Sequence, residues 1–185
     1  DVISQELEGF YLEQALSVRY ISNKPLLLIN IGGGSTELII KQDGEVLERV
    51  YLELGVRTVL ARFPHINDEI SKHSLEEVLK FVKTKLPQKT IVTPVAIYNG
   101  GELTYMEVAG YDLDKNEVFE DIDHPKMINL AKFQARNREI FQSVQLSELE
   151  KYMPEDPLWM HGARACSAIA QAICEKFQVK TIVPS

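Results

Sequence analysis

Runs of apolar residues divide the chain into segments of two kinds. Near-continuous apolar runs cover residues 26–31 and 36–42, which is typical of short strands buried on both faces. A third strand is predicted over residues 46–54, returning through the turn Gln42-Asp43-Gly44-Glu45. The first half of the chain therefore predicts a set of three neighbouring strands.

Apolar residues recur at helical spacing elsewhere, with a Ser74/Glu77 capping box at the start of one segment. The predicted helices cover residues 6–20, 55–63, 74–86, 129–141, 146–153 and 161–178. Strands are predicted within 89–101 and 179–185. Residues 102–123 are ambiguous, and their acidic part, YDLDKNEVFEDID at residues 111–123, is expected to form a surface excursion. This alternation predicts a mixed α/β domain.

Composition sets limits on the class of protein. The chain has 185 residues, of which 45% are hydrophobic, and a net charge of −7. We expect no nucleic-acid partner, because such proteins usually carry a basic stripe, and no membrane partner, because no apolar run is long enough to span a bilayer. Cys166 and Cys174 show no metal-binding spacing and predict a reducing, cytoplasmic location. The chain opens on Asp1, and we expect a fragment or an excised domain.

Three consecutive glycines interrupt the strand region in the sequence INIGGGSTELII, residues 29–40. Glycine weakens a strand, so its presence here indicates a tight turn or a backbone that stands bare beside a ligand. A glycine-rich turn between strands can aim several amide N–H groups at one anion, phosphate above all. Ser35 and Thr36 add hydroxyl donors, and Glu37 adds a carboxylate that can orient water or hold a metal.

The glycine sequence resembles the DIGGGSTEL motif of the exopolyphosphatase / guanosine pentaphosphate phosphatase (Ppx/GppA) family. Three other segments are similar to the same family: VISQELEGF at residues 2–10, LELGVRTV at 52–59 and HGARACSAIAQAI at 161–173. The resemblance implies an α/β, ribonuclease-H-like (actin-like ATPase) domain with a mixed sheet and helices on both faces. Residues 1–185 would form one such domain, the second half of a two-domain phosphatase whose first half is absent.

The resemblance also implies roles for individual residues. Glu8 would be the catalytic base, activating a water against a terminal phosphorus, and Glu37 would help to place that water or a Mg²⁺ ion. Asn30 stands at the family's metal-binding aspartate. Phosphate oxygens would be held by Gly32, Gly33, Gly34, Ser35 and Thr36, and by Gly100 and Gly101 of a second glycine loop.

The function implied is removal of the terminal phosphate from inorganic polyphosphate or guanosine pentaphosphate (pppGpp), between which the sequence does not choose. The partners implied are one of these phosphate compounds and the absent N-terminal actin-like domain, with a homodimer left open. Mg²⁺ is the implied cofactor. On its own, such a domain would be inactive because half of its cleft is missing.

Two departures from the family pattern bear on catalysis. Asn30 replaces an aspartate, and an amide binds Mg²⁺ more weakly than a carboxylate does. The second loop reads YNGGEL, which places Glu102 where a carboxylate would repel a polyanion. A module that binds polyphosphate or a guanosine alarmone without cleaving it is therefore an alternative, and the ATPase half of a sugar- or acetate-kinase relative is a third. Arg57, which follows Gly55 at a strand-to-helix turn, could reach a phosphate or form a surface ion pair.

Overall fold

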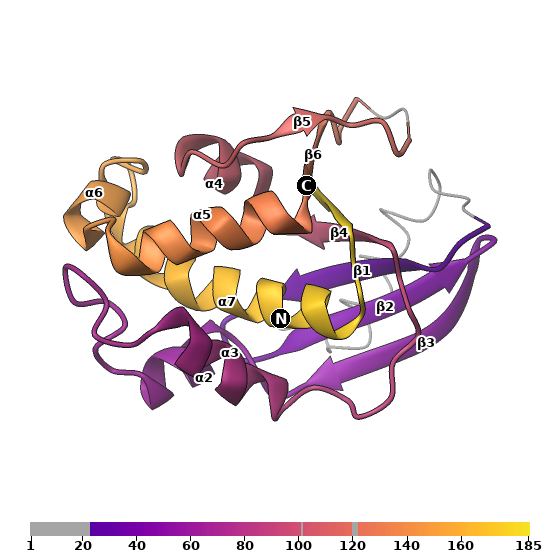
Figure 1. Ribbon diagram of the computed structural model, residues 1–185, viewed down its shortest axis with the longest axis horizontal. Coiled ribbons are helices and arrows are strands. Elements are labelled where there is room, and N and C mark those ends of the chain that lie inside the picture. Colours follow the sequence, from indigo (N-terminus) through magenta and orange to yellow (C-terminus); the bar gives the residue numbers. More distant parts are fainter. Residues whose placement is uncertain (1–22, 101, 120–121) are drawn as a thin grey trace, which may run out of the picture.

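The computed structural model describes residues 23–100, 102–119 and 122–185, and these form one mixed sheet with helices packed on it (Figure 1). The seven strands lie in the order β3-β2-β1-β4-β7-β6-β5. Their bounds are β1 Leu26–Ile31, β2 Thr36–Gln42, β3 Glu45–Leu52, β4 Val95–Asn99, β5 Asp114–Lys115, β6 Lys126–Asn129 and β7 Thr181–Pro184. Pairs β1–β4 and β4–β7 are parallel, whereas β1–β2, β2–β3, β5–β6 and β6–β7 are antiparallel. The predicted α/β class and mixed sheet are confirmed.

The hairpin between β2 and β3 forms where the sequence predicted it. Asp43 and Gly44 occupy its two turn positions with φ angles of 52° and 84°. Positive φ at both positions gives the turn that matches the twist of paired strands, and Asp-Gly is a favoured pair for it. The turn therefore fixes the register in which Glu37 of β2 faces Tyr51 of β3.

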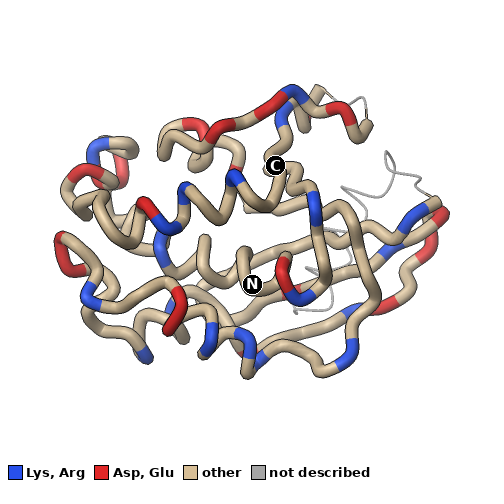
Figure 2. Tube along the Cα trace, in the orientation of Figure 1, with Lys and Arg blue, Asp and Glu red and all other residues tan. Residues whose placement is uncertain are grey.

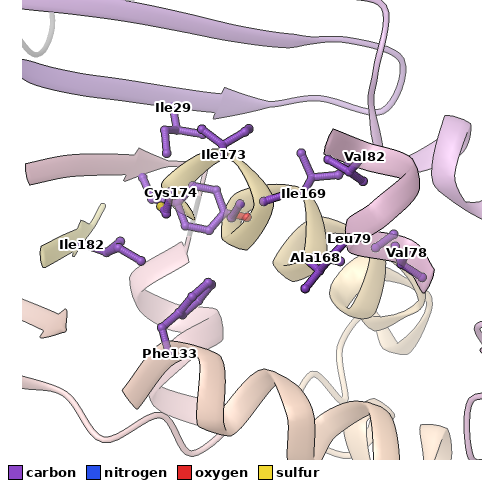
Figure 3. Close-up of a cluster of buried hydrophobic side chains, with 14 of the residues drawn as sticks. Ile29, Val78, Leu79, Val82, Phe133, Ala168, Ile169, Ile173, Cys174 and Ile182 are labelled. Atoms are coloured by element: carbon purple, nitrogen blue, oxygen red, sulfur yellow. The ribbon is translucent and has the colours of Figure 1, made fainter. Parts of the chain in front are cut away.

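Helix α7, Ala163–Lys176, is the centre of the main core (Figure 3). Its small residues allow close packing, and eleven of its fourteen residues are buried. Helices α3 (Leu75–Lys83) and α5 (Leu130–Gln142) pack against it, and Figure 3 shows Val78, Leu79 and Val82 of α3 turned toward it. The remaining helices are α2 Val56–Arg62, α4 Glu102–Val108, α6 Leu146–Glu150 and the 3₁₀ helix η1 Pro157–Gly162.

The two faces of the sheet bury different sets of side chains. Leu27 and Ile29 of β1 belong to the main core with α7. Leu28, between them, belongs to a smaller cluster on the opposite face that also contains Ile39 of β2 and Ile97 of β4. Because strand side chains alternate between faces, Asn30 and Glu37 lie on the face of the smaller cluster, and Ile31 lies on the face of α7.

Several predicted boundaries change in the structure. Residues 102–108, which were ambiguous in the sequence, form helix α4, which buries Tyr105 and Met106. The strand predicted within 89–101 begins only at Val95, because Pro94 has no amide hydrogen to donate to a ladder. Strands β5 and β6 were not predicted. The helix predicted at residues 6–20 lies outside the described residues.

Arg164 of α7 connects this helix to the loop at residues 66–69 and to the end of α5. The Arg164 side chain is fully buried, and its five N–H groups donate to the carbonyls of Ile66, Asp68, Glu69, Ile140 and Val144 at 2.7–3.3 Å. Burial lowers the pKa of this guanidinium. Because every donor has a partner, the charge is stabilised without a carboxylate in direct contact.

Basic and acidic residues are interspersed along the described chain (Figure 2). In residues 23–100, 102–119 and 122–185, no helix combines the length and the apolar character that crossing a bilayer requires.

Candidate functional site

The glycine turn between β1 and β2 is held by hydrogen bonds to its carbonyl groups. The Gly32 amide donates to the Ser35 carbonyl at 2.8 Å and closes the turn. The carbonyls of Gly32 and Gly33 accept from the amides of Val56 and Arg57 at 3.1 and 2.8 Å. In a trans peptide the N–H points opposite to the C=O, and the described chain has no cis peptides. The N–H groups of Gly33 and Gly34 therefore point away from α2, and no described acceptor takes either of them.

Gly55 is the residue that lets α2 approach this turn. A Cβ atom on Gly55 would lie 2.5 Å from the Gly32 oxygen and 2.6 Å from both the Gly33 carbon and the Gly34 nitrogen. Any side chain there would displace the turn backbone. The glycine immediately before α2 is therefore as necessary to the turn as the three glycines within it.

The two hydroxyl residues of the turn differ in availability. The Thr36 side chain is buried, and its hydroxyl donates to the Leu54 carbonyl at 2.6 Å. Its one hydrogen is used inside the protein, so the predicted donation from this hydroxyl to phosphate is not available in the structure. The Ser35 hydroxyl has no hydrogen bond to any other described residue, so it stays a candidate donor to a ligand.

Asn30 and Glu37 are direct cross-strand partners on one face of the sheet. Tyr51 of β3 is the next residue in the same row, and its hydroxyl hydrogen-bonds Glu37. Partial burial, and then the Glu37 charge, raise the pKa of Tyr51. The Glu37 carboxylate is itself buried, being 5% exposed.

This pair is the predicted Mg²⁺ site. Mg²⁺ commonly binds one or two carboxylates, with substrate phosphates and water filling the remaining positions. One carboxylate beside one amide oxygen fits that donor set. The described residues contain no group of three His, Cys, Asp or Glu side chains that could hold a metal alone. Ligand phosphates would therefore have to supply much of the coordination.

Arg57 contributes a cation at the edge of the glycine turn. Its Nε lies 3.2 Å from the position a Cβ would take on Gly33, and its Nη2 lies 3.6 Å from the same position on Gly34. No described carboxylate forms an ion pair with this guanidinium, so the surface ion pair considered from sequence does not form within residues 23–100, 102–119 and 122–185. The exposed guanidinium is placed to meet an anion bound at the turn.

A cavity of about 140 Å³ lies against the glycine turn, between α2, the β4–α4 loop and the start of α7. The turn supplies Gly32 and Gly33 to its wall, and the second loop supplies Gly100, whose φ is 129°. Among the described lining residues of the cavity, Glu102 at the start of α4 is the one acidic residue, and none is basic. The remaining described lining residues are Ile31, Val56, Tyr105, Trp159, Gly162, Ala163 and Cys166.

Burial controls the protonation of the groups around Glu102. The carboxyl is 6% exposed, and removal from water raises its pKa to about 8, against the lowering effect of hydrogen bonds from Tyr98 and Cys166. The Cys166 thiol lies 2.9 Å from the Tyr98 hydroxyl and 3.9 Å from Glu102 Oε1. Burial raises the pKa of both the thiol and the phenol well above their usual values. At neutral pH all three groups are mainly neutral.

The model of the Ppx/GppA phosphatase family matches residues 1–151. The chain belongs to this family. A search of curated protein sequences found no match.

Solved structures of Ppx/GppA proteins share the fold. The crystal structure of the Aquifex aeolicus family member is 19% identical with a TM-score of 0.75, and the match covers 100% of this chain and 60% of that one. An exopolyphosphatase from Cytophaga hutchinsonii is 17% identical with a TM-score of 0.66, over 94% of this chain and 56% of that one. This chain thus spans less than two thirds of the length of these relatives.

The structure brings together most, but not all, of the residues predicted for the site. Gly32, Gly33, Gly34 and Ser35 form the turn, and Gly100 lies across the cavity from it. The predicted base Glu8 and the loop residue Gly101 lie outside the described residues. His161, considered from sequence as an anion donor, instead pairs through Nε2 with Glu150 Oε1 at 2.7 Å.

Three residues of the site were missed in the sequence. Gly55 was predicted to lie at a strand-to-helix turn, in the segment at 52–59 that resembles the family, but not to pack against the glycine turn. Trp159 and Cys166 come to the cavity from η1 and α7, more than 100 residues after the glycine turn. Cys166 lies in the segment at 161–173 that resembles the family, but no local pattern places either residue beside Gly32.

Proposed function

We propose that this chain is a domain of a phosphoanhydride hydrolase that removes the terminal phosphate from inorganic polyphosphate or pppGpp. The observation that carries the proposal is the glycine turn, whose carbonyls are bound by α2 while the N–H groups of Gly33 and Gly34 are left for a ligand. Ppx/GppA membership and the fold shared with an exopolyphosphatase support the reaction class. A cytoplasmic location agrees with the two free cysteines.

In the proposed reaction the turn binds oxygens of the terminal phosphate. Amide N–H groups fixed before the substrate arrives stabilise negative charge that grows in the transition state, without further reorganisation. The Arg57 guanidinium beside the same backbone adds positive charge, and the Ser35 hydroxyl adds a donor. Glu37 orients the attacking water, and Glu8, by resemblance, accepts its proton.

Asn30 and Glu37 would hold Mg²⁺ together with the phosphates of the substrate. When bound, the ion neutralises phosphate charge and helps to align the phosphoanhydride. Because Asn30 is neutral, half-maximal activity should need a higher Mg²⁺ concentration than in an Asn30→Asp variant.

The test is phosphate release by the full-length protein with Mg²⁺, using tripolyphosphate and pppGpp as substrates. We expect phosphate release from at least one substrate. The rate of release should fall at least about 100-fold in Glu8→Ala and Glu37→Gln. In Arg57→Gln the KM should rise about tenfold. The exposed Glu107→Gln is the matched control and should keep full activity. Absence of release from both substrates by the unmodified protein would contradict hydrolysis.

One observation favours binding without hydrolysis. The described metal-binding pair offers a single carboxylate, because Asn30 stands opposite Glu37. A binding module would hold tripolyphosphate on the glycine turn with Mg²⁺ present but release no phosphate. Recovery of hydrolysis in Asn30→Asp would then identify the missing carboxylate as the reason.

A further inference from the structure

The cavity beside the glycine turn combines a buried carboxyl with two aromatic side chains. Glu102, Tyr105 and Trp159 all line it, and its described lining contains no Lys, Arg or His side chain. The side chains that hydrogen-bond the Glu102 carboxyl are Tyr98 and Cys166, and neither of them is a cation. Among the described residues, the carboxyl therefore has hydrogen-bond partners but no positive charge to stabilise its ionised form.

The chemistry of these walls excludes several classes of ligand. A phosphate in the cavity would lose its hydration, gain no cation and face a carboxyl. A divalent metal ion needs about six oxygen ligands, and the described residues hold no group of three His, Cys, Asp or Glu side chains. The carbonyls of Gly32 and Gly33 already accept from amides of α2. A small organic cation, in contrast, can use both the carboxyl and the apolar walls.

The size of the cavity suits a short aliphatic chain. Its volume of about 140 Å³ is close to that of the apolar cavity, about 150 Å³, that admits benzene in another protein. An n-butylammonium ion has fewer non-hydrogen atoms than benzene, so it fits this volume. The ring centroids of Tyr105 and Trp159 lie 6.1 Å apart, and Trp159 is 41% exposed, which places it at the edge of the cavity toward solvent. Aromatic faces of this kind attract a cation.

We propose that this cavity binds a primary alkylammonium ion, with the ammonium group on the Glu102 carboxylate and the alkyl chain against Tyr105 and Trp159. An ammonium group is a compact charge that one carboxylate can neutralise. A guanidinium would bring five N–H donors into a cavity whose described side chains offer few acceptors. The proposal does not depend on the proposed function, because it concerns a ligand without phosphate.

The surroundings of Glu102 decide how this site responds to pH. The titratable groups that face the carboxyl are neutral at pH 7: Tyr98 of β4, Tyr105 of α4, Tyr111 after α4, and Cys166 of α7. The charged side chain at the start of α2, Arg57, does not line the cavity, and His161 of η1 pairs with Glu150 instead. Glu102 is therefore the described group of the cavity that titrates near neutral pH.

Binding of the ammonium ion should release a proton. The pKa of Glu102 is about 8, so at pH 7 the carboxyl holds a proton that passes to the buffer when the ammonium group takes its place. The ligand keeps its own charge, because an alkylammonium loses its proton only near pH 10. The affinity should therefore rise about 20-fold between pH 6.5 and pH 8.5, and binding at pH 7 should release about 0.9 proton.

The experiment compares n-butylammonium with n-butanol, which has the same chain and no charge. The protein is titrated with each compound by calorimetry at pH 6.5, 7 and 8.5, in two buffers of different ionisation enthalpy, so that released protons are counted. At pH 8.5 we expect n-butylammonium to bind about tenfold more tightly than n-butanol. The binding of n-butanol should release no proton and should not depend on pH.

Two variants assign the effect to the carboxyl. In Glu102→Gln, n-butylammonium should bind about tenfold more weakly at pH 8.5 and should lose both its pH dependence and its proton release. The affinity for n-butanol should change by less than about twofold, which shows that the cavity is intact. Glu107→Gln, exposed on the same helix, should match the unmodified protein with both compounds.

Three results would overturn the proposal. One is the absence of saturable n-butylammonium binding at pH 8.5 up to tens of millimolar. Another is equal affinity for n-butylammonium and n-butanol at that pH, which would mean that the cavity does not recognise the charge. The last is unchanged n-butylammonium binding in Glu102→Gln. None of these results bears on phosphate release, and a failure of phosphate release would leave the amine site standing.

Discussion

Two buried ionisable side chains near the start of α7 are treated in opposite ways by their surroundings. Arg164 has five N–H donors and five backbone carbonyls to receive them, at 2.7–3.3 Å. Glu102 is buried to a similar degree but meets a thiol, a phenol and the wall of a cavity. The first arrangement is complete without a ligand, and the second leaves room for one.

The two residues show two kinds of buried ionisable group: one that stabilises the fold and one that can serve a ligand. A fully bonded buried cation joins the loop at residues 66–69 to the end of α5, and no partner is needed from outside. A buried carboxyl without a neighbouring cation is costly to ionise, so its pKa rises. Such a carboxyl can still form hydrogen bonds with a ligand. Substitutions at the two positions should therefore change stability in opposite directions.

The largest effect is expected at Arg164. Arg164→Ala leaves five backbone carbonyls without their donors and should reduce the free energy of unfolding by about 4 kcal/mol or more. Arg164→Lys keeps the charge but offers three donors, so about half of this loss should remain. Urea denaturation monitored by circular dichroism measures both.

The control for this experiment is Arg138→Ala, an exposed arginine on α5 that should change stability by less than about 0.5 kcal/mol. A loss below about 1 kcal/mol in Arg164→Ala would show that the carbonyl network contributes little, and the comparison with Glu102 would fail.

The next effect is a gain in stability at Glu102 that depends on pH. Below about pH 4.5 the carboxyl is protonated in both the folded and the unfolded state and costs nothing. Between pH 4.5 and about 8 it ionises only when unfolded, so the folded state loses relative stability as the pH rises, and the loss levels off above the folded pKa. Glu102→Gln should remove this loss and be more stable at pH 9 by on the order of a few kcal/mol.

Unfolding curves of Glu102→Gln and the unmodified protein at pH 5, 7 and 9 measure this gain. The matched control is Glu107→Gln, which is exposed on the same helix and should show no such divergence. Equal stability of Glu102→Gln and the unmodified protein at pH 9 would mean that the carboxyl is well hydrated and that the cavity does not isolate it.

A smaller effect on stability, but a large one on binding, is expected at Gly55. Gly55→Ala places a Cβ 2.5–2.6 Å from the backbone of the turn and should displace it, costing about 2 kcal/mol of stability and most of the affinity for tripolyphosphate. Gly44→Ala is the control: it strains a φ of 84° in open space, so it should lower stability by about 1 kcal/mol without changing binding. Unchanged tripolyphosphate affinity in Gly55→Ala would show that the glycine turn is not the anion site.

The predictability of the fold and of the site differs along the chain. Strands β1 and β2, the Asp43-Gly44 turn and the Ser74 cap were predicted because local patterns determine them. Helix α4 was missed because it has only seven residues, and its buried apolar set of Tyr105 and Met106 is too short to show a clear helical period. The turn itself could be predicted from its glycines.

The cavity could not be predicted, because four segments distant in sequence meet there. The sheet order places β4 beside β1, which brings the loop containing Gly100 to the glycine turn. Packing of α7 then adds Cys166, and burial changes the charge of Glu102. The sequence indicated that a carboxylate here would repel a polyanion, whereas the folded protein holds it mainly neutral at pH 7.

The central claim is that the N–H groups of Gly33 and Gly34 bind a negatively charged oxygen. The most direct test is a titration of ¹⁵N-labelled protein with tripolyphosphate, following each glycine amide by NMR. The account predicts large, saturable shifts of the Gly33 and Gly34 amides and none at Gly44 or Gly110. Shifts confined to other residues at saturating tripolyphosphate would contradict it.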